Sequence, residues 1–204
     1  MDMNNCRVFI LKDNGCAFST EIFKNFYRFC ILIGEYLRQY DYSDGYIFVF
    51  DLTNGSLMEM VSAINLLDMR NIFSVLMEGY GLRLKGIHLL TSPSTLGNVI
   101  DLFVGILRSM VSKKIGDRIH VHKTLDSFYE QVPREILPKE YEGKEDMTMY
   151  ELRDKWIRVL TSPETLSFFK EIFESKVYES IKQTKSFQED HLGLPGSFRK
   201  LNVD

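Results

Sequence analysis

Four short runs of the chain either consist mainly of apolar residues or alternate apolar with polar ones. They lie at residues 6–12, 45–52, 82–90 and 118–122. Runs of this length that are rich in β-branched and aromatic residues and end in turn formers predict β-strands. The run at 45–52 is apolar at every position before Asp51, which is typical of a central strand covered on both faces.

The segments between these runs carry apolar residues at every third or fourth position, which predicts helices. The first helix is expected to begin at Thr20, the second to run from Ser56 to Gly79, and the third to cover residues 94–112 after Pro93. Strands that alternate with helices in this way predict an α/β fold with right-handed crossovers and a mixed, largely parallel sheet.

Beyond this region the chain becomes more polar, and two amphipathic helices are predicted there. One spans residues 149–160, and the other begins after Ser162 and carries apolar residues as far as Ile181. We expect residues 1–143 to form the core of one domain and residues 144–204 to pack on it as C-terminal helices and a tail.

Composition narrows the class of protein. The 204 residues are 45% hydrophobic with a net charge of −3, which allows a sizeable core and does not indicate nucleic-acid binding. The longest apolar stretch, residues 29–33, is far shorter than the roughly 20 residues that span a membrane, so no transmembrane segment is expected. Cys6, Cys16 and Cys30 form no C-x-x-C pair, and no signal-peptide pattern precedes them, so we expect reduced thiols and a cytoplasmic location.

Motifs that carry catalytic chemistry are incomplete. Gly81 and Gly86 have the spacing of a phosphate-binding loop, but Ile87 stands where that loop needs lysine. No G-x-S-x-G elbow is present for a serine nucleophile. Asp51 ends its strand where α/β folds place functional acids, and it can equally cap the next turn through Thr53; both interpretations stay open. We therefore expect no catalytic residues, no cofactor and no enzyme activity.

The histidines offer an incomplete metal site. His120 and His122 are two positions apart on a predicted strand, so both imidazoles point to one face and could bind a metal. No carboxylate or thiol lies at ligand spacing, so polar contacts at a strand edge are the preferred interpretation and no metal is expected. His88, inside an apolar strand, is expected to be a hydrogen-bonded core residue.

Four segments together resemble the CRAL-TRIO lipid-binding domain family, and most of all its tocopherol-transfer, retinaldehyde-binding and clavesin branch. They are YGLRLKGIHLLTSP (80–93), RIHVH (118–122), VPREILPKEYEG (132–143) and PGSFRKLNVD (195–204). The chain departs from the family pattern at Gly81, where proline is usual, and the resemblance includes no counterpart of the family's N-terminal helical lobe. The resemblance implies a sheet that floors a cavity for one small hydrophobic ligand, with the helix after Pro93 as a mobile lid.

The resemblance also implies which side chains line this cavity. The expected lining residues are Phe48, Phe50, Ile72, Val75, Leu76, Tyr80, Leu82 and Ile87, and the expected lid residues are Leu96, Val99, Ile100 and Phe103. For each of them, ordinary packing in a protein core is the alternative.

Two cations interrupt an otherwise apolar strand. Arg83 and Lys85 are two positions apart and therefore share a face. By resemblance, these two residues join Lys114 and Arg118, with Lys113 as an extra cation, in a patch that binds a phosphoinositide head group. A solvated strand edge with acidic partners is the alternative.

The sequence therefore predicts a cytoplasmic carrier that associates peripherally with membranes. It would bind one tocopherol, retinoid, carotenoid or similar lipid and exchange it at membranes that contain phosphoinositides. The alternative is a phosphoinositide-sensing or scaffolding module that transfers no ligand.

Overall fold

The computed structural model describes residues 5–15 and 17–175. The chain forms two compact units, Met1–Val159 and Leu160–Asp204. In the second unit, helix α8 (Pro163–Glu174) begins where the sequence predicts, with Ser162 accepting a hydrogen bond from the backbone N–H of Thr165. The predicted continuation to Ile181 lies outside the described residues.

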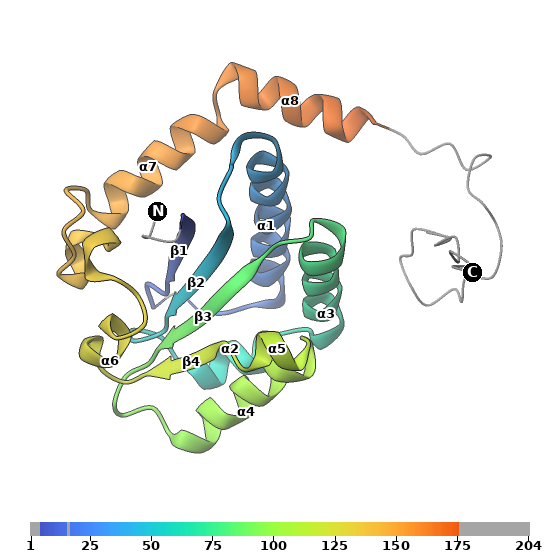
Figure 1. Ribbon diagram of the computed structural model, residues 1–204. Coiled ribbons are helices and arrows are strands. Elements are labelled where there is room, and N and C mark those ends of the chain that lie inside the picture. The colour runs from blue at the N-terminus through green and yellow to red at the C-terminus, as the bar shows by residue number, and fades with distance from the viewer. Residues whose placement is uncertain (1–4, 16, 176–204) are drawn as a thin grey trace, which may run out of the picture. The chain divides into compact units, whose positions relative to one another are not determined.

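The first unit is built on a parallel sheet. Its strands are β1 (Cys6–Lys12), β2 (Gly45–Asp51), β3 (Leu84–Leu90) and β4 (Ile119–His122), which lie side by side in chain order. Right-handed crossovers between parallel strands that advance in one direction bring every intervening helix to the same face. Figure 1 shows α1, α3 and α4 on that face, which confirms the predicted α/β fold.

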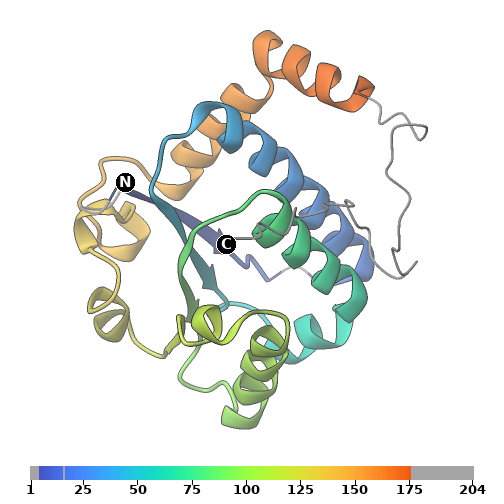
Figure 2. The ribbon, with the colours of Figure 1, turned by 45° about the vertical axis from the view of Figure 1, so that its right-hand side comes forward.

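The helices of this unit differ in length. They are α1 (Thr20–Tyr40), α2 (Leu57–Ala63), α3 (Leu66–Ser74), α4 (Gly97–Ser109), α5 (Lys113–Gly116), α6 (Leu125–Tyr129) and α7 (Met149–Leu160). A π-helical turn, η1 (Val75–Gly79), follows α3, and the 3-10 turns η2 (Arg134–Ile136) and η3 (Lys139–Tyr141) precede α7. The two views in Figures 1 and 2 place α1 beside α3, which it contacts.

Three helix boundaries differ from the predicted ones. The N-cap of α1 is Ser19, whose hydroxyl accepts from the N–H of Ile22, so Thr20 is already helical. The predicted helix 56–79 is broken because Asn65 accepts from two backbone N–H groups and starts α3 anew. The helix after Pro93 begins only at Gly97 and ends at Ser109.

No crossover helix covers the other face of the sheet, so residues 125–143 cover it. Phe128, Val132 and Leu137 are completely buried there against Ile47 and Val49 of β2. These five side chains form the centre of a second hydrophobic cluster.

A buried polar contact fastens this cover to the sheet. The hydroxyl of Tyr141 donates to Oδ2 of Asp51 over 2.8 Å, and Nζ of Lys12 lies 3.4 Å from the same oxygen. Thr53 donates to the other oxygen through its N–H and its hydroxyl. Although burial opposes ionisation, these donors lower the pKa of Asp51. Asp51 therefore caps the turn, as one of its two interpretations predicted, and also fixes the cover.

Among the described residues, no single helix is both long and apolar enough to cross a membrane. Leu57–Ala63 and Leu66–Gly79 reach that length and composition only as a pair, across a bend of 84°.

We expect Tyr141→Phe to lower the free energy of unfolding by about 1–3 kcal/mol, because it leaves a buried carboxylate oxygen of Asp51 without its hydroxyl donor. Urea denaturation at neutral pH measures this loss. Tyr42→Phe removes a hydroxyl from a side chain that is 89% exposed and serves as the control, with a change within about 0.5 kcal/mol. Equal stability of the two variants would contradict the role of this contact.

Candidate functional site

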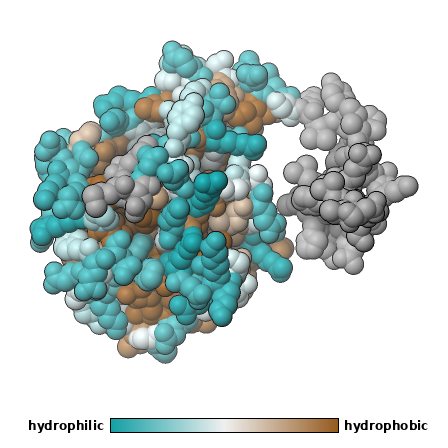
Figure 3. Space-filling model, viewed as in Figure 1, coloured by the Kyte–Doolittle hydropathy of each residue, from teal (hydrophilic) through white to brown (hydrophobic). Residues whose placement is uncertain are grey.

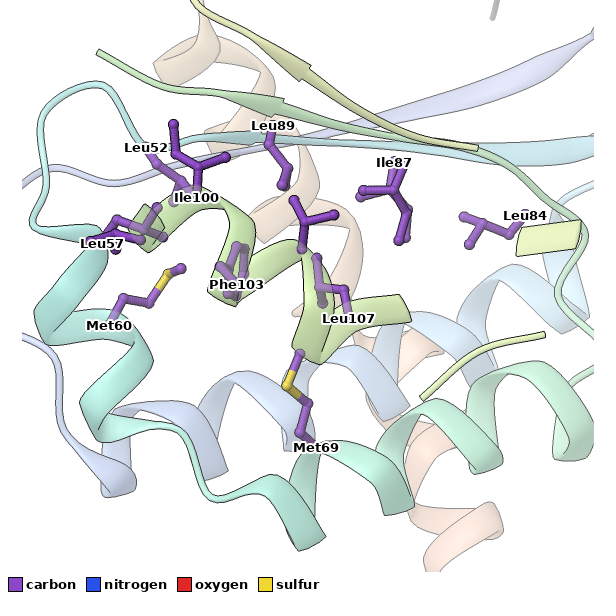
Figure 4. Packing of buried hydrophobic residues seen from close by; sticks show 13 residues of the cluster. Leu52, Leu57, Met60, Met69, Leu84, Ile87, Leu89, Ile100, Phe103 and Leu107 are labelled. Atoms are coloured by element: carbon purple, nitrogen blue, oxygen red, sulfur yellow. The ribbon is translucent and has the colours of Figure 1, made fainter. Parts of the chain in front are cut away.

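The helical face of the sheet is closely packed over β3. Ile87 and Leu89 of β3 meet Val99, Ile100 and Phe103 of α4, and all five are buried. Figure 4 shows side chains of this cluster pointing toward one another from β3, α2 and α4, with Met69 of α3 at its edge. This half of the face is an ordinary protein core.

Over β2 and under α1, the same face is less completely buried. Phe48 and Phe50 point toward the helices and are only half-buried, whereas Val49 on the opposite face of β2 is completely buried. Helix α1 has 21 residues, yet only Gly34 and Leu37 are buried in it. A central strand and a long apolar helix would normally bury these surfaces fully. We call this half-buried apolar region the α1 zone, and it is the candidate ligand site.

Several half-buried aromatic and aliphatic side chains border the α1 zone and pack against the closed cluster. They are Phe23 and Tyr27 from α1, Phe48 and Phe50 from β2, Phe73 from α3 and Met77 from η1. The α1 zone is therefore continuous with the core and is lined by residues from four elements.

Polar groups in the α1 zone are few. Burial raises the pKa of the Cys30 thiol to about 12, and burial together with Asp68 raises the pKa of the Tyr27 phenol to about 12. The Tyr80 hydroxyl donates to Oε1 of Glu35 over 2.5 Å, and burial and this carboxylate raise the Tyr80 pKa. The Cys30 thiol and the Tyr27 and Tyr80 phenols therefore stay protonated at neutral pH, so the α1 zone offers neutral polar groups beside the carboxylate of Glu35.

The expected ligand-lining residues fall into two groups. Phe48 and Phe50 lie in the α1 zone, and Val75, Leu76, Tyr80 and Leu82 are half-buried in or just after η1. Ile72 and Ile87 are buried, and Ile87 belongs to the closed cluster. Their contact with a ligand stays a prediction.

The expected lid helix is α4, and it lies closed on the sheet. Val99, Ile100 and Phe103 pack in the core, whereas Leu96 precedes the helix and is 67% exposed. To act as a lid, α4 would have to lift these three side chains out of a packed cluster.

The predicted cations gather at the amino ends of β3 and β4. The Arg118 guanidinium donates to the Leu84 carbonyl, between the exposed residues Arg83 and Lys85. Lys113 and Lys114 are exposed on α5, which contacts β3.

Within residues 5–15 and 17–175, none of these five cations has an acidic partner within 4.0 Å, although Asp117 follows α5 in the chain. The alternative of a strand edge neutralised by ion pairs therefore has no support among the described residues. We call these five residues the cation patch.

Sequence patterns did not single out α1 as part of the site. Gly34 is the signal that was available, because a glycine inside a long helix often marks a close approach. A Cβ atom at Gly34 would lie 3.2 Å from the Tyr80 ring, so Gly34 lets Tyr80 cross α1 and reach Glu35. Gly34 and Glu35 lie far from Tyr80 in the chain, and for this reason the sequence did not predict their contact.

The three histidines of β3 and β4 form one stacked group. Nδ1 of His88 lies 3.0 Å from Nε2 of His122, whose Nδ1 lies 3.2 Å from the Ser127 hydroxyl oxygen. The His88 ring also stacks on His120 with a centroid distance of 5.2 Å. His88 is thus a hydrogen-bonded core residue, as predicted, but His122 is buried rather than at an exposed edge.

The histidine group does not form a metal centre. Among the described residues, no group of three or more His, Cys, Asp or Glu side chains could hold a metal ion. Burial lowers the pKa of His88 to about 3 and also lowers the pKa of His122, so these two rings are uncharged at neutral pH.

Comparison with known proteins places the chain in a family. A sequence model of the CRAL/TRIO domain matches residues 1–143. Similar proteins named alpha-tocopherol transfer protein-like occur in Mus musculus, Pongo abelii and Homo sapiens. Each is 29% identical over 75 residues, which cover 36% of this chain and 21% of the relative. The match thus spans about one fifth of the length of these relatives.

We expect the folded protein to lose stability as the pH falls from 7 to 5. The unfolded chain binds a proton at His88 near pH 6.5, whereas the folded chain does not until about pH 3, so acid favours unfolding. The expected loss is about 2 kcal/mol between pH 6.5 and pH 5, from about 1.4 kcal/mol per pH unit. Urea denaturation at several pH values measures it. In His88→Gln the decline should be clearly shallower, and an unchanged decline would show that other groups cause it.

Proposed function

Because this chain belongs to the CRAL/TRIO domain family, a family of lipid-binding and lipid-transfer proteins, we propose that it carries one small hydrophobic molecule in the α1 zone. The incomplete burial of Phe48 and Phe50 carries this proposal, because central-strand aromatics at the helical face are otherwise covered by protein. We further propose that the molecule is exchanged at membranes that contain phosphoinositides.

The proposed ligand is mainly hydrocarbon and carries at most one or two polar groups. Each methylene removed from water contributes about 0.8 kcal/mol, so about ten methylenes would hold a ligand by roughly 8 kcal/mol. The Tyr80 hydroxyl donates to Glu35 and can accept a hydrogen bond from a ligand, and the neutral thiol of Cys30 can donate a weak one. A tocopherol, a retinoid, a carotenoid or a similar lipid fits this chemistry, and no step in carriage requires a catalytic residue.

Membrane docking is assigned to the cation patch. Clustered Arg and Lys side chains suit multiply charged phosphates, because each contact is a charge-assisted hydrogen bond. The absence of acidic partners for these cations among the described residues leaves their charge available.

The chain path connects docking to release. Helix α5 carries Lys113 and Lys114 and directly follows α4, with which it is in contact. A membrane bound at α5 would therefore lie at the C-terminal end of the closed helix. Lifting α4 into lipid would move its apolar face from protein to hydrocarbon, which costs far less than exposing that face to water.

The alternative function, phosphoinositide sensing without transfer, uses the cation patch and leaves the α1 zone empty. Retained cargo separates the two. Mass spectrometry of small molecules extracted from the purified, folded protein should detect a lipid or isoprenoid at a ratio close to one per chain. A folded protein that has no cargo and still binds phosphoinositide vesicles would favour the sensing module.

We expect Phe48→Trp to reduce the amount of retained ligand several-fold, because the larger ring occupies space in the α1 zone, while the melting temperature of the ligand-free protein changes little. Phe173→Trp makes the same substitution on α8 at a side chain that is 71% exposed, and its ligand content should equal that of the wild type. Equal ligand content in both variants would exclude the α1 zone as the binding site.

We expect Arg83→Ala combined with Lys114→Ala to weaken binding to phosphoinositide vesicles by about 30-fold, from about 1 kcal/mol for each cation near an anionic surface. Ligand transfer to those vesicles should slow accordingly, as measured with a fluorescent lipid. Lys139→Ala with Lys155→Ala removes the same charge from two other exposed positions and serves as the control. Unchanged transfer in the first variant would refute docking through the cation patch.

A further inference from the structure

Among the described residues, strand β4 is an edge strand whose outer side carries no further strand. The carbonyl oxygens of Arg118 and His122 accept bonds from the backbone of β3, at Ile87 and Thr91. Because backbone groups alternate in direction along a strand, the N–H and C=O groups of the intervening residues 119 and 121 point to the other side. In the part of the chain that the structure describes, no strand pairs with that side.

The two edges of the sheet differ in what lies next to them. At β1, the α7 residue Trp156 lies near the Phe9 and Tyr36 rings, with centroid distances of 6.5 and 5.8 Å. At β4, the corresponding place is a cleft of about 470 Å³ between α4 and α6. Open edges invite pairing with another strand, and proteins usually cover or charge them.

The cleft is apolar at its floor. Ile100 and Val104 of α4 line it together with Ile119 and Val121 of β4, and Val121 is 37% exposed. The other side of the cleft is polar and is lined by His120, His122, Ser127, Glu130 and Gln131. Figure 3 shows hydrophobic surface in the lower part of the view, where α4 and β4 lie in Figure 1. A cleft with one apolar and one polar side fits a strand that alternates apolar and polar residues, as β4 itself does.

The rim of the cleft carries opposite charges at its two ends. Nε of Arg108 donates to the carbonyl of Gly116, which places this cation at the amino end of β4. Asp101 lies seven residues earlier on α4, about 10.5 Å along the helix axis and toward the carboxyl end of β4. Both side chains are exposed and line the cleft. A second copy turned end for end would place its Asp101 against this Arg108, and its Arg108 against this Asp101.

Gly105 lies near the midpoint between these two charges. It is exposed in the interior of α4, where glycine lowers helix stability relative to alanine, and no atom lies within 4 Å of a Cβ built there. Nothing within the described part of this chain thus requires a glycine at this position. A neighbouring helix that crosses α4 at this point would require it, because a side chain would hold the two backbones apart.

We infer that two copies of this chain pair through β4 in an antiparallel arrangement about a two-fold axis. His120 of each copy lies opposite His120 of the other, and the backbone groups of Ile119 and Val121 form four hydrogen bonds across the axis. The two α4 helices meet at Gly105, flanked by two symmetric ion pairs between Asp101 and Arg108. An eight-stranded sheet results, and its interface is self-complementary, as two-fold symmetry demands.

Sedimentation velocity of the full chain over a range of protein concentrations tests this pairing. The wild type should reach a mass about twice 23.8 kDa. Arg108→Glu alone and Asp101→Arg alone each place like charges together and should raise the dimer dissociation constant about tenfold or more. The double variant Arg108→Glu with Asp101→Arg restores opposite charges and should restore the dimer.

Two further variants make the test independent of general charge effects. Arg70→Glu changes the charge equally at an exposed position on α3 and should leave the dimer intact. Gly105→Leu should dissociate the dimer while the circular dichroism spectrum keeps its helical signal. A wild type that stays monomeric at every concentration would overturn the inference, and so would a folded double variant that stays monomeric while both single variants dissociate.

Discussion

Parallel strands that follow one another across the sheet in chain order dictate where the rest of the first unit must lie. Every right-handed crossover returns on the same side, so α1 to α5 all lie against one face. The opposite face carries Ile47 and Val49, which would be exposed without residues 125–143. The contact between Tyr141 and Asp51 ties this cover to the carboxyl end of the central strand. The helical face and its structural backing therefore lie on opposite sides of one sheet.

The helical face itself is divided in its packing. Helix α4 closes over β3 with core-like burial, whereas α1 leaves the aromatic side chains of β2 half-covered. Such incomplete burial gives up hydrophobic stabilisation that a closely packed core would provide. In the proposed function, a bound hydrophobic molecule would complete the burial of the side chains that α1 leaves half-covered.

Neutral and charged side chains also occupy different parts of the first unit. Burial keeps the thiol of Cys30 protonated and the His88 ring uncharged, whereas the buried carboxylate of Asp51 is held by Tyr141, Thr53 and Lys12. The five residues of the cation patch, which have no acidic partner within 4.0 Å among the described residues, lie at the amino ends of β3 and β4 and on the short helix that follows α4. Separation of an apolar interior from a cationic rim is what binding of a lipid and docking on an anionic surface require of one domain. The outward side of α4 and β4 carries a third, mixed-charge surface suited to a second copy of the chain.

The sequence by itself determined the element types and the family, because the apolar periodicity of each segment and the motifs around Leu82–His88 and Leu137–Gly143 are local features. It also identified Arg83 and Lys85 as unusual, since two cations in an apolar strand are visible without a fold. Only the tertiary structure decided that Ser19 and Asn65 cap their helices. It also decided that Phe48 and Phe50 are half-buried whereas Ile87 lies in the core. The contact of Tyr80 with Glu35 across Gly34 is a third outcome of this kind. Those outcomes depend on how residues far apart in the chain compete for the same space and the same hydrogen bonds. Apolar periodicity and short motifs in the sequence contain no information about such long-range packing.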